Sequence, residues 1–246
     1  MKIFGKTHIG LVRETNQDAY ATGEFSNGDC WAVVCDGMGG VSGGQVASRL
    51  CVEKIAQSIE RGYREKMTVS TAKNLLNSAI SVANTAVFKQ AQESPELKGM
   101  GTTVVAVMVL GNIAVVAHVG DSRAYLLTGF NIKPVTKDHS YVQLLVDTGK
   151  ITPEMAKVHP DRNIITRAVG IEHVVDAEID IVDVNNGDSL LICTDGLNGY
   201  VDDVDIFRIV NNYGDSSTEK LVETANDAGG HDNVTVVIMT AQSQGE

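Results

Sequence analysis

Trp31-Ala32-Val33-Val34-Cys35-Asp36-Gly37-Met38-Gly39-Gly40 joins an unbroken apolar run to an aspartate and several glycines. The apolar run has the composition of a buried strand, and Asp36 begins the turn that follows it. A second segment repeats this arrangement, because Ser189-Leu190-Leu191-Ile192-Cys193-Thr194 is followed by Asp195-Gly196. Each segment therefore predicts a buried strand that carries an aspartate to its end.

Two more aspartates adjoin apolar strands: Asp121 follows residues 113–119, and Asp232 precedes residues 234–239. Taken singly, each is explained as a turn residue. Four of them would gather at one rim of the sheets, where carboxylates repel one another and take up protons unless a cation neutralises them. Oxygen ligands favour Mg²⁺ or Mn²⁺ over Zn²⁺, and the Gly37 carbonyl is a further candidate ligand. We therefore expect a shared metal site.

The remaining pattern predicts an α+β fold with two antiparallel sheets covered by helices on the outside. Apolar residues recur at helical spacing from Ala47 to Ile59 and from Leu76 to Val87. Ser216-x-x-Glu219 has the form of a capping box that opens a further helix, and Gly111-Asn112 is typical of a hairpin turn. Strands are predicted at residues 7–12, 19–25, 30–35, 102–110, 113–119, 124–127, 176–182, 189–193 and 234–239.

Composition restricts the class of protein. The 246 residues include 43% hydrophobic and 21% charged residues, which indicates a folded chain, and no linker divides it, so residues 1–246 are expected to form one domain. The net charge of −11 disfavours nucleic acid and anionic membranes as partners. The four cysteines lack metal or disulfide spacing and are interpreted as reduced core residues. With no secretory signal at the N-terminus, we expect a cytoplasmic protein. We also expect it to be a monomer.

Seven short blocks, in order along nearly the whole chain, resemble the metal-dependent (type 2C, PPM) protein serine/threonine phosphatases, specifically their compact bacterial members. One such block is weak evidence, whereas seven in the right order are specific. The blocks are Arg13-Glu14-Thr15-Asn16-Gln17-Asp18, Asp36-Gly37-Met38-Gly39-Gly40, Gly101-Thr102-Thr103, Val119-Gly120-Asp121-Ser122-Arg123, Asp138-His139-Ser140, Thr194-Asp195-Gly196 and Asp232-Asn233-Val234-Thr235.

The resemblance implies a four-layer α-β-β-α sandwich with two Mn²⁺ or Mg²⁺ ions at one edge, between the sheets. By similarity, Asp36 bridges the two ions and Gly37 adds its carbonyl to one of them. Asp195 and Asp232 ligate the other ion, and Asp18 acts mainly through a bound water. The implied activity is hydrolysis of phosphoserine and phosphothreonine in proteins by a metal-activated bridging water.

Further roles also follow from the resemblance. Asp121, together with Asp195, resembles a third, weaker metal site, and Arg13 matches the arginine that holds the substrate phosphate. Residues 138–170 cover the position of the mobile flap of the family. Phosphorylated proteins are the expected substrates, and a serine/threonine kinase is the expected opposing partner in bacterial signalling.

The proton donor is where the chain departs from the family pattern. Many eukaryotic relatives have a histidine where Met38 stands, and bacterial relatives often have one where this chain has Val41. Neither side chain can protonate a leaving oxygen, although general acid catalysis is worth about 10²–10⁴ in rate. Our hypothesis is that a water held by a metal, at the Asp121 site, replaces it.

The histidines carry weaker signals. His8 and His118 fall in strand patterns and are interpreted as core groups with satisfied hydrogen bonds. His139 and His159 lie within the flap region, where they contact phosphate or only order the loop. His231 is adjacent to Asp232 and is a candidate for supporting that ligand.

The same residues disfavour two other functions and leave one alternative open. A cysteine-dependent phosphatase needs an arginine six residues after its cysteine, and none of the four cysteines has one. The glycines after Asp36 break the dinucleotide-binding pattern at its last position. The remaining alternative is a catalytically silent phosphatase-like regulator that binds phosphoproteins, although such a module would not need the full set of aspartates.

Overall fold

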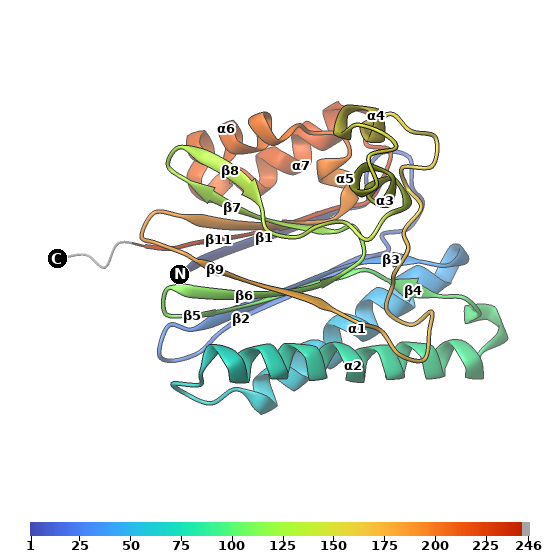
Figure 1. Ribbon diagram of the computed structural model, residues 1–246, viewed down its shortest axis with the longest axis horizontal. Helices are drawn as coiled ribbons and strands as arrows, with labels where there is room; N and C mark the ends of the chain where they lie inside the picture. The colour runs from blue at the N-terminus through green and yellow to red at the C-terminus, as the bar shows by residue number, and fades with distance from the viewer. Residues whose placement is uncertain (243–246) are drawn as a thin grey trace.

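The computed structural model describes residues 1–242, apart from the side chain of Val41. Two antiparallel sheets lie face to face, and helices cover both outer faces (Figure 1). The expected α+β class and the four-layer α-β-β-α arrangement are therefore confirmed.

Strands that are consecutive in the sequence do not alternate regularly between the two sheets. In order across the first sheet they are β1 (Lys2–His8), β11 (Val234–Thr240), β10 (Ser189–Cys193), β7 (Arg123–Thr128) and β8 (Asn131–Pro134). In the second sheet they are β2 (Asp18–Glu24), β3 (Cys30–Met38), β5 (Val104–Leu110), β6 (Ile113–Val119) and β9 (Glu178–Asp183). The short β4 (Gly101–Thr102) also pairs with β3.

The helices form the two outer layers (Figure 1). The second sheet is covered by α1 (Gly40–Gly62) and α2 (Val69–Glu93), and the first by α6 (Asp203–Tyr213) and α7 (Ser217–Asp227). The shorter elements are α3 (Tyr141–Asp147), α4 (Pro153–Lys157), α5 (Asp195–Asn198), η1 (Pro95–Leu97) and η2 (Gly214–Ser216). The sequence pattern did not predict β8 or any of α3 to α6.

Strand β3 shows why an unbroken apolar run was needed. Its residues alternate between two cores, so Val33 and Cys35 pack in the core beneath α1 and α2. Ala32 and Val34 pack in the core between the sheets, which also includes Leu190 of β10. Because both faces of the strand are covered, no polar residue can alternate with the apolar ones.

The first predicted strand is misplaced. β1 ends at His8, so the predicted strand at 7–12 is wrong beyond that point. Gly10 has a φ of +83°, and its amide donates a hydrogen bond to Nδ1 of His8 at 3.0 Å. Leu11 then donates to the carbonyl of Gly230 at 2.7 Å, so a turn held by another part of the chain ends the strand.

The predicted capping box is also wrong. α7 begins at Ser217, and the Ser216 side chain makes no capping hydrogen bond. Instead, the Ser217 hydroxyl donates to the Gly214 carbonyl at 2.6 Å. The 3-10 turn η2 therefore leads directly into the helix.

The predicted strand at 102–110 is two strands, β4 and β5, separated by Thr103. The hairpin that follows is confirmed, because Leu110 pairs with Ile113 and Gly111 has a φ of +59°. All four cysteines are free and buried, as predicted. Within residues 1–242, no helix combines the length and apolar character needed to cross a membrane.

Candidate active site

One cleft of about 670 Å³ lies where β3 ends and where the chain leaves β10. Six of the seven predicted site residues line it: Arg13, Asp36, Gly37, Asp121, Asp195 and Asp232. The seventh, Asp18, lies buried beside the cleft and is the β-sheet partner of Asp36. The fold therefore brings together residues that are separated by more than 200 positions in the sequence.

Asp18 is held by two hydroxyl groups. Its Oδ2 accepts hydrogen bonds from Thr194 Oγ1 at 2.9 Å and from Thr235 Oγ1 at 2.7 Å. Its Oδ1 is buried and has no hydrogen-bond partner, and the same is true of Oδ1 of Asp195. A buried acceptor without a hydrogen-bond partner is costly, and both carboxylate oxygens are available as ligands for a cation.

The backbone of Asp36 and Gly37 is tightly fixed. The Asp36 amide donates to Thr103 Oγ1 at 3.0 Å, and its carbonyl accepts from the Thr103 amide at 2.8 Å. The Gly37 amide donates to the Gln17 carbonyl at 3.1 Å, and a Cβ at Gly37 would collide with the carbonyl oxygen of Gly44. Only glycine therefore fits at this position.

Burial and mutual repulsion raise the pKa of several of these carboxyl groups. Burial first, and then the charges of Asp18 and Asp195, raise the pKa of Asp36 well above its usual range. Burial raises the pKa of Asp18 to about 7, and burial with the charge of Asp195 raises that of Asp121 to about 8. Burial and the charge of Asp232 raise the pKa of Asp195 as well. Without a cation, the cleft therefore cannot keep all of these carboxyl groups ionised.

The pH dependence of stability without metal should report this repulsion. In the unfolded chain Asp121 loses its proton near pH 4, whereas in the fold it keeps the proton up to about pH 8. Between these values the unfolded state binds fewer protons, so the free energy of unfolding falls as pH rises. We expect Asp121→Asn, in chelator, to be more stable than wild type by on the order of 5 kcal/mol at about pH 8 and by little at about pH 4.

Urea denaturation of both proteins across this pH range measures the difference. Asp183→Asn is a matched control, because Asp183 is an exposed aspartate on β9. A difference between wild type and Asp121→Asn that is constant with pH, or that grows towards acid pH, would contradict the expected repulsion.

Arg13 reaches across the cleft to Asp232. Its guanidinium donates to Asp232 Oδ2 at 2.7 Å, while Asp232 Oδ1 accepts from the Asn233 amide at 2.8 Å. This hydrogen bond, with the nearby charges of Asp195 and Asp36, raises the pKa of Arg13. The arginine is therefore a charged, half-exposed group close to three carboxyl groups, those of Asp36, Asp195 and Asp232.

No histidine lines the cleft in the described part of the chain. Met38 lines the cleft. It lies two residues after Asp36 on β3, and alternate residues of a strand face the same side. The side chain of Val41 lies outside the described part of the structure. The hypothesis that the Asp121 site supplies the proton donor stays a prediction.

The segment 138–170 contains α3 and α4 and borders the cleft through Asn163 and Ile165. Its first residue, Asp138, forms a two-pronged ion pair with Arg123, with both N–O distances at 2.7 Å. This pair anchors the entry to the segment. The mobility expected of a flap stays a prediction.

Comparison with known proteins identifies a family over nearly the whole chain. The protein phosphatase 2C family model matches residues 4–240. The chain belongs to this family. The crystal structure of the serine/threonine phosphatase Stp1 of Staphylococcus aureus is 36% identical to this phosphatase 2C chain, covers 98% of it and 95% of its own chain, and has a TM-score of 0.92.

A second relative of this phosphatase 2C chain is longer. The serine/threonine protein phosphatase PstP of Mycobacterium tuberculosis is 38% identical over 239 residues, which are 97% of the chain but 44% of PstP. The structure of the PstP catalytic domain in complex with two manganese ions has 34% identity, a TM-score of 0.83 and 96% coverage of both chains. The chain thus spans less than half of the length of this relative.

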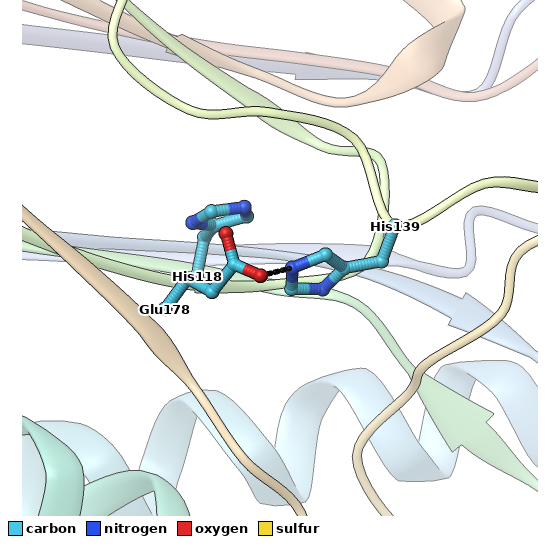
Figure 2. A group of neighbouring side chains, drawn as sticks. All are labelled: His118, His139 and Glu178. Atoms are coloured by element: carbon cyan, nitrogen blue, oxygen red, sulfur yellow. Dashed lines mark ion pairs between the residues drawn. The ribbon is translucent and has the colours of Figure 1, made fainter. Parts of the chain in front are cut away.

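A cluster of histidines in this phosphatase 2C chain was not predicted as a group. Figure 2 shows His118, His139 and Glu178 side by side. Their potential ligand atoms all lie within 4.8 Å of one another. The imidazole rings stack with centroids 4.6 Å apart, and Glu178 Oε1 lies 3.2 Å from His139 Nε2. Within residues 1–242 no other set of three potential metal-ligating side chains is as close.

Hydrogen bonding makes this cluster a poor metal site. The Gly120 amide donates to His139 Nδ1 at 3.1 Å, so the neutral ring keeps its proton on Nε2, the atom that faces Glu178. Burial, then the charges of His118 and Arg167, lower the pKa of His139 to about 4, so the ring is neutral near pH 7. A metal ligand would need a free lone pair at Nε2.

His139 instead fixes the backbone next to Asp121. The His139 amide donates to the Gly120 carbonyl at 2.9 Å, and His139 Nδ1 accepts from the Gly120 amide. His139 therefore bonds both polar backbone groups of Gly120. His118 is buried, as expected, but it is not fully satisfied: Nε2 bonds the Lys137 carbonyl at 2.8 Å and Nδ1 has no partner. The Asp138-His139-Ser140 block was the only sequence signal for this cluster.

Proposed function

We propose that the chain is a metal-dependent phosphatase that hydrolyses phosphoserine and phosphothreonine in proteins. The single observation that carries this proposal is the cleft that unites Arg13 with four aspartates and the Gly37 backbone. A phosphate monoester carries two negative charges and is among the slowest of esters to hydrolyse without catalysis. A site for it needs cations, and the carboxylates of this cleft are suited to hold them.

The donor set fits divalent Mn²⁺ or Mg²⁺. Two core ions would be held by Asp36, the Gly37 carbonyl, Asp195 and Asp232, with Asp18 acting mainly through water. Asp121, together with Asp195, would hold a third, weaker ion. The unpartnered oxygens of Asp18 and Asp195 and the raised pKa values of the carboxyl groups support this assignment. When bound, such ions lower the pKa of a coordinated water and offset charge on the phosphoryl oxygens.

The chain's own residues orient the substrate. Arg13 can exchange its bond to Asp232 for a two-pronged contact with the phosphate once a cation neutralises that carboxylate. The fixed backbone at Asp36 and Gly37 holds the donor oxygens in one geometry, so little reorganisation is needed when substrate binds.

Two further features of the proposal come from the family resemblance: a serine/threonine kinase as the opposing enzyme and a flap over residues 138–170. A cytoplasmic location, a monomeric state and one catalytic domain over residues 1–246 are also part of the proposal. A silent phosphoprotein-binding regulator is the alternative, but no observation in the structure favours it.

Metal dependence provides the direct test. We expect hydrolysis of an aryl phosphate and of a phosphothreonine peptide with Mn²⁺ or Mg²⁺, and none with chelator. Activity that survives chelation would contradict the proposal. Metal binding, measured by calorimetry, without turnover of either substrate would favour the silent regulator instead.

Arg13→Ala should lower kcat/KM by about 10²-fold, because the phosphate loses a charged, orienting contact. Arg13→Lys should recover only part of this loss, since an ammonium group cannot bind two phosphoryl oxygens in the same plane. Steady-state kinetics at saturating Mn²⁺ measure both variants. Wild-type kcat/KM in Arg13→Ala would show that the arginine serves only to bind Asp232.

A further inference from the structure

A second cavity, of about 230 Å³, adjoins the cleft and shares Met38 and Ile165 with it. Ala168, Ile171 and Val174 contribute further apolar lining. A water molecule occupies about 30 Å³ in the liquid, so the cavity has room for several waters or for one side chain. It opens directly beside the place where the phosphate is expected to bind.

Strand β3 sets the distance between the two sites. Asp36 and Met38 are alternate residues of this strand, so they face the same side and lie about 6–7 Å apart. Alternate residues of an extended peptide have the same separation. A peptide whose phosphorylated residue lies at Asp36 would therefore bring a side chain within two positions of that residue to the cavity.

Asn84 of α2 fixes the backbone of residues 170–173, which form the outer wall of the cavity. The Asn84 side chain is only 1% exposed. Its Oδ1 accepts from the Gly170 amide at 2.7 Å. Its Nδ2 donates to the carbonyls of Glu172 and His173 at 3.0 and 3.2 Å. Three hydrogen bonds from one buried side chain thus fix residues 170–173, so the wall is formed before any ligand arrives.

The side chains of Met38 and Ile171 converge over Gly101 of β4. A Cβ at Gly101 would lie 2.8 Å from Ile171 Cδ1 and 2.9 Å from Met38 Cε. Glycine at this position therefore allows the two side chains to approach each other. The backbone behind them is also tied down, since Val169 and Thr102 exchange two hydrogen bonds of 2.9 and 3.0 Å.

The chemistry of the lining selects the ligand. Ile171 is 42% exposed and Val174 is 69% exposed, so apolar surface next to the cleft is in contact with water. Covering such surface with another apolar group is favourable. The charged lining residues are Glu172, Asp176 and Arg167, and Arg167 is already paired with Glu178 at 3.1 Å. The two carboxylates therefore disfavour an acidic side chain in the cavity.

We propose that this cavity is a subsite for one large aliphatic side chain of the substrate, within two residues of the phosphorylated serine or threonine. The proposal rests on the proposed phosphatase activity and names the class of phosphoprotein sequence that the cleft prefers. The shared residues Met38 and Ile165 make the subsite continuous with the phosphate site.

The test uses phosphothreonine peptides, each of which differs from a parent peptide at a single position. Leucine, asparagine or alanine is placed in turn at each of four positions, the two before and the two after the phosphothreonine. Leucine and asparagine are similar in shape, so their comparison isolates apolar character. We expect leucine at one position to raise kcat/KM about 10-fold over asparagine. Equal values at all four positions would overturn the subsite, whereas no hydrolysis of any peptide would contradict the proposed function.

Two variants locate the preference. Ala168→Met should fill the cavity and abolish the leucine preference, and Ile171→Thr should reduce it severalfold. Ile181→Thr is the matched control, because Ile181 is 47% exposed on β9 and lines neither cavity. All three should hydrolyse an aryl phosphate like wild type, which checks their folding. A leucine preference that persists in both Ala168→Met and Ile171→Thr would overturn the assignment to this cavity.

Discussion

Asp36→Asn is expected to abolish phosphatase activity and, in chelator, to stabilise the fold. Asp36 is the carboxylate whose pKa is raised well above its usual range, first by burial and then by Asp18 and Asp195. Folding without metal requires the Asp36 carboxyl to take up a proton near neutral pH, whereas an amide needs none, so the free energy of unfolding without metal should rise. The same change removes the proposed bridging ligand, so turnover should fall by at least about 10³-fold.

Two measurements on Asp36→Asn distinguish the loss of a metal ligand from damage to the fold. Turnover of an aryl phosphate is measured with Mn²⁺, and urea denaturation is measured in chelator. Asp183→Asn, an exposed aspartate on β9, should change neither quantity. A variant that is both inactive and less stable than wild type would indicate damage to the fold, and it would contradict the expected repulsion among the carboxylates.

Asp121→Ala is expected to separate two classes of substrate. No histidine lines the cleft in the described part of the chain, and Met38 cannot donate a proton. The leaving oxygen of phosphoserine or phosphothreonine needs a proton, whereas a nitrophenolate leaves without one. If the proton donor is held at Asp121, phosphopeptide turnover should fall by about 10²–10⁴, and hydrolysis of p-nitrophenyl phosphate should change little.

Steady-state kinetics with both substrates measure this separation at saturating Mn²⁺. The aryl phosphate is the internal control, since a misfolded variant would lose both activities together. Unchanged turnover of the phosphopeptide would show that the proton comes from elsewhere in the cleft.

Local pattern predicted most of the strands and two long helices, for reasons that the structure makes plain. β3 and β10 are covered on both faces, so their apolar runs are continuous and easily recognised. The errors occur where a distant contact determines a boundary. β1 ends early because the turn after it is bonded to Gly230, and no local signal near residue 8 reveals that contact.

The sequence by itself determined the chemistry: aspartates at the ends of apolar strands, glycines where no side chain fits, and an arginine among the family's motif blocks. The strand ends are local features, because each depends on a few neighbouring residues. The space that requires glycine at position 37 is set by the more distant backbone of Gln17 and Gly44. Only the tertiary structure decided which groups share space. It placed Asp18 beside the cleft, joined His139 to Gly120, and fixed an apolar cavity through Asn84. Such contacts join residues far apart in the chain, so their energies depend on packing that no local pattern records.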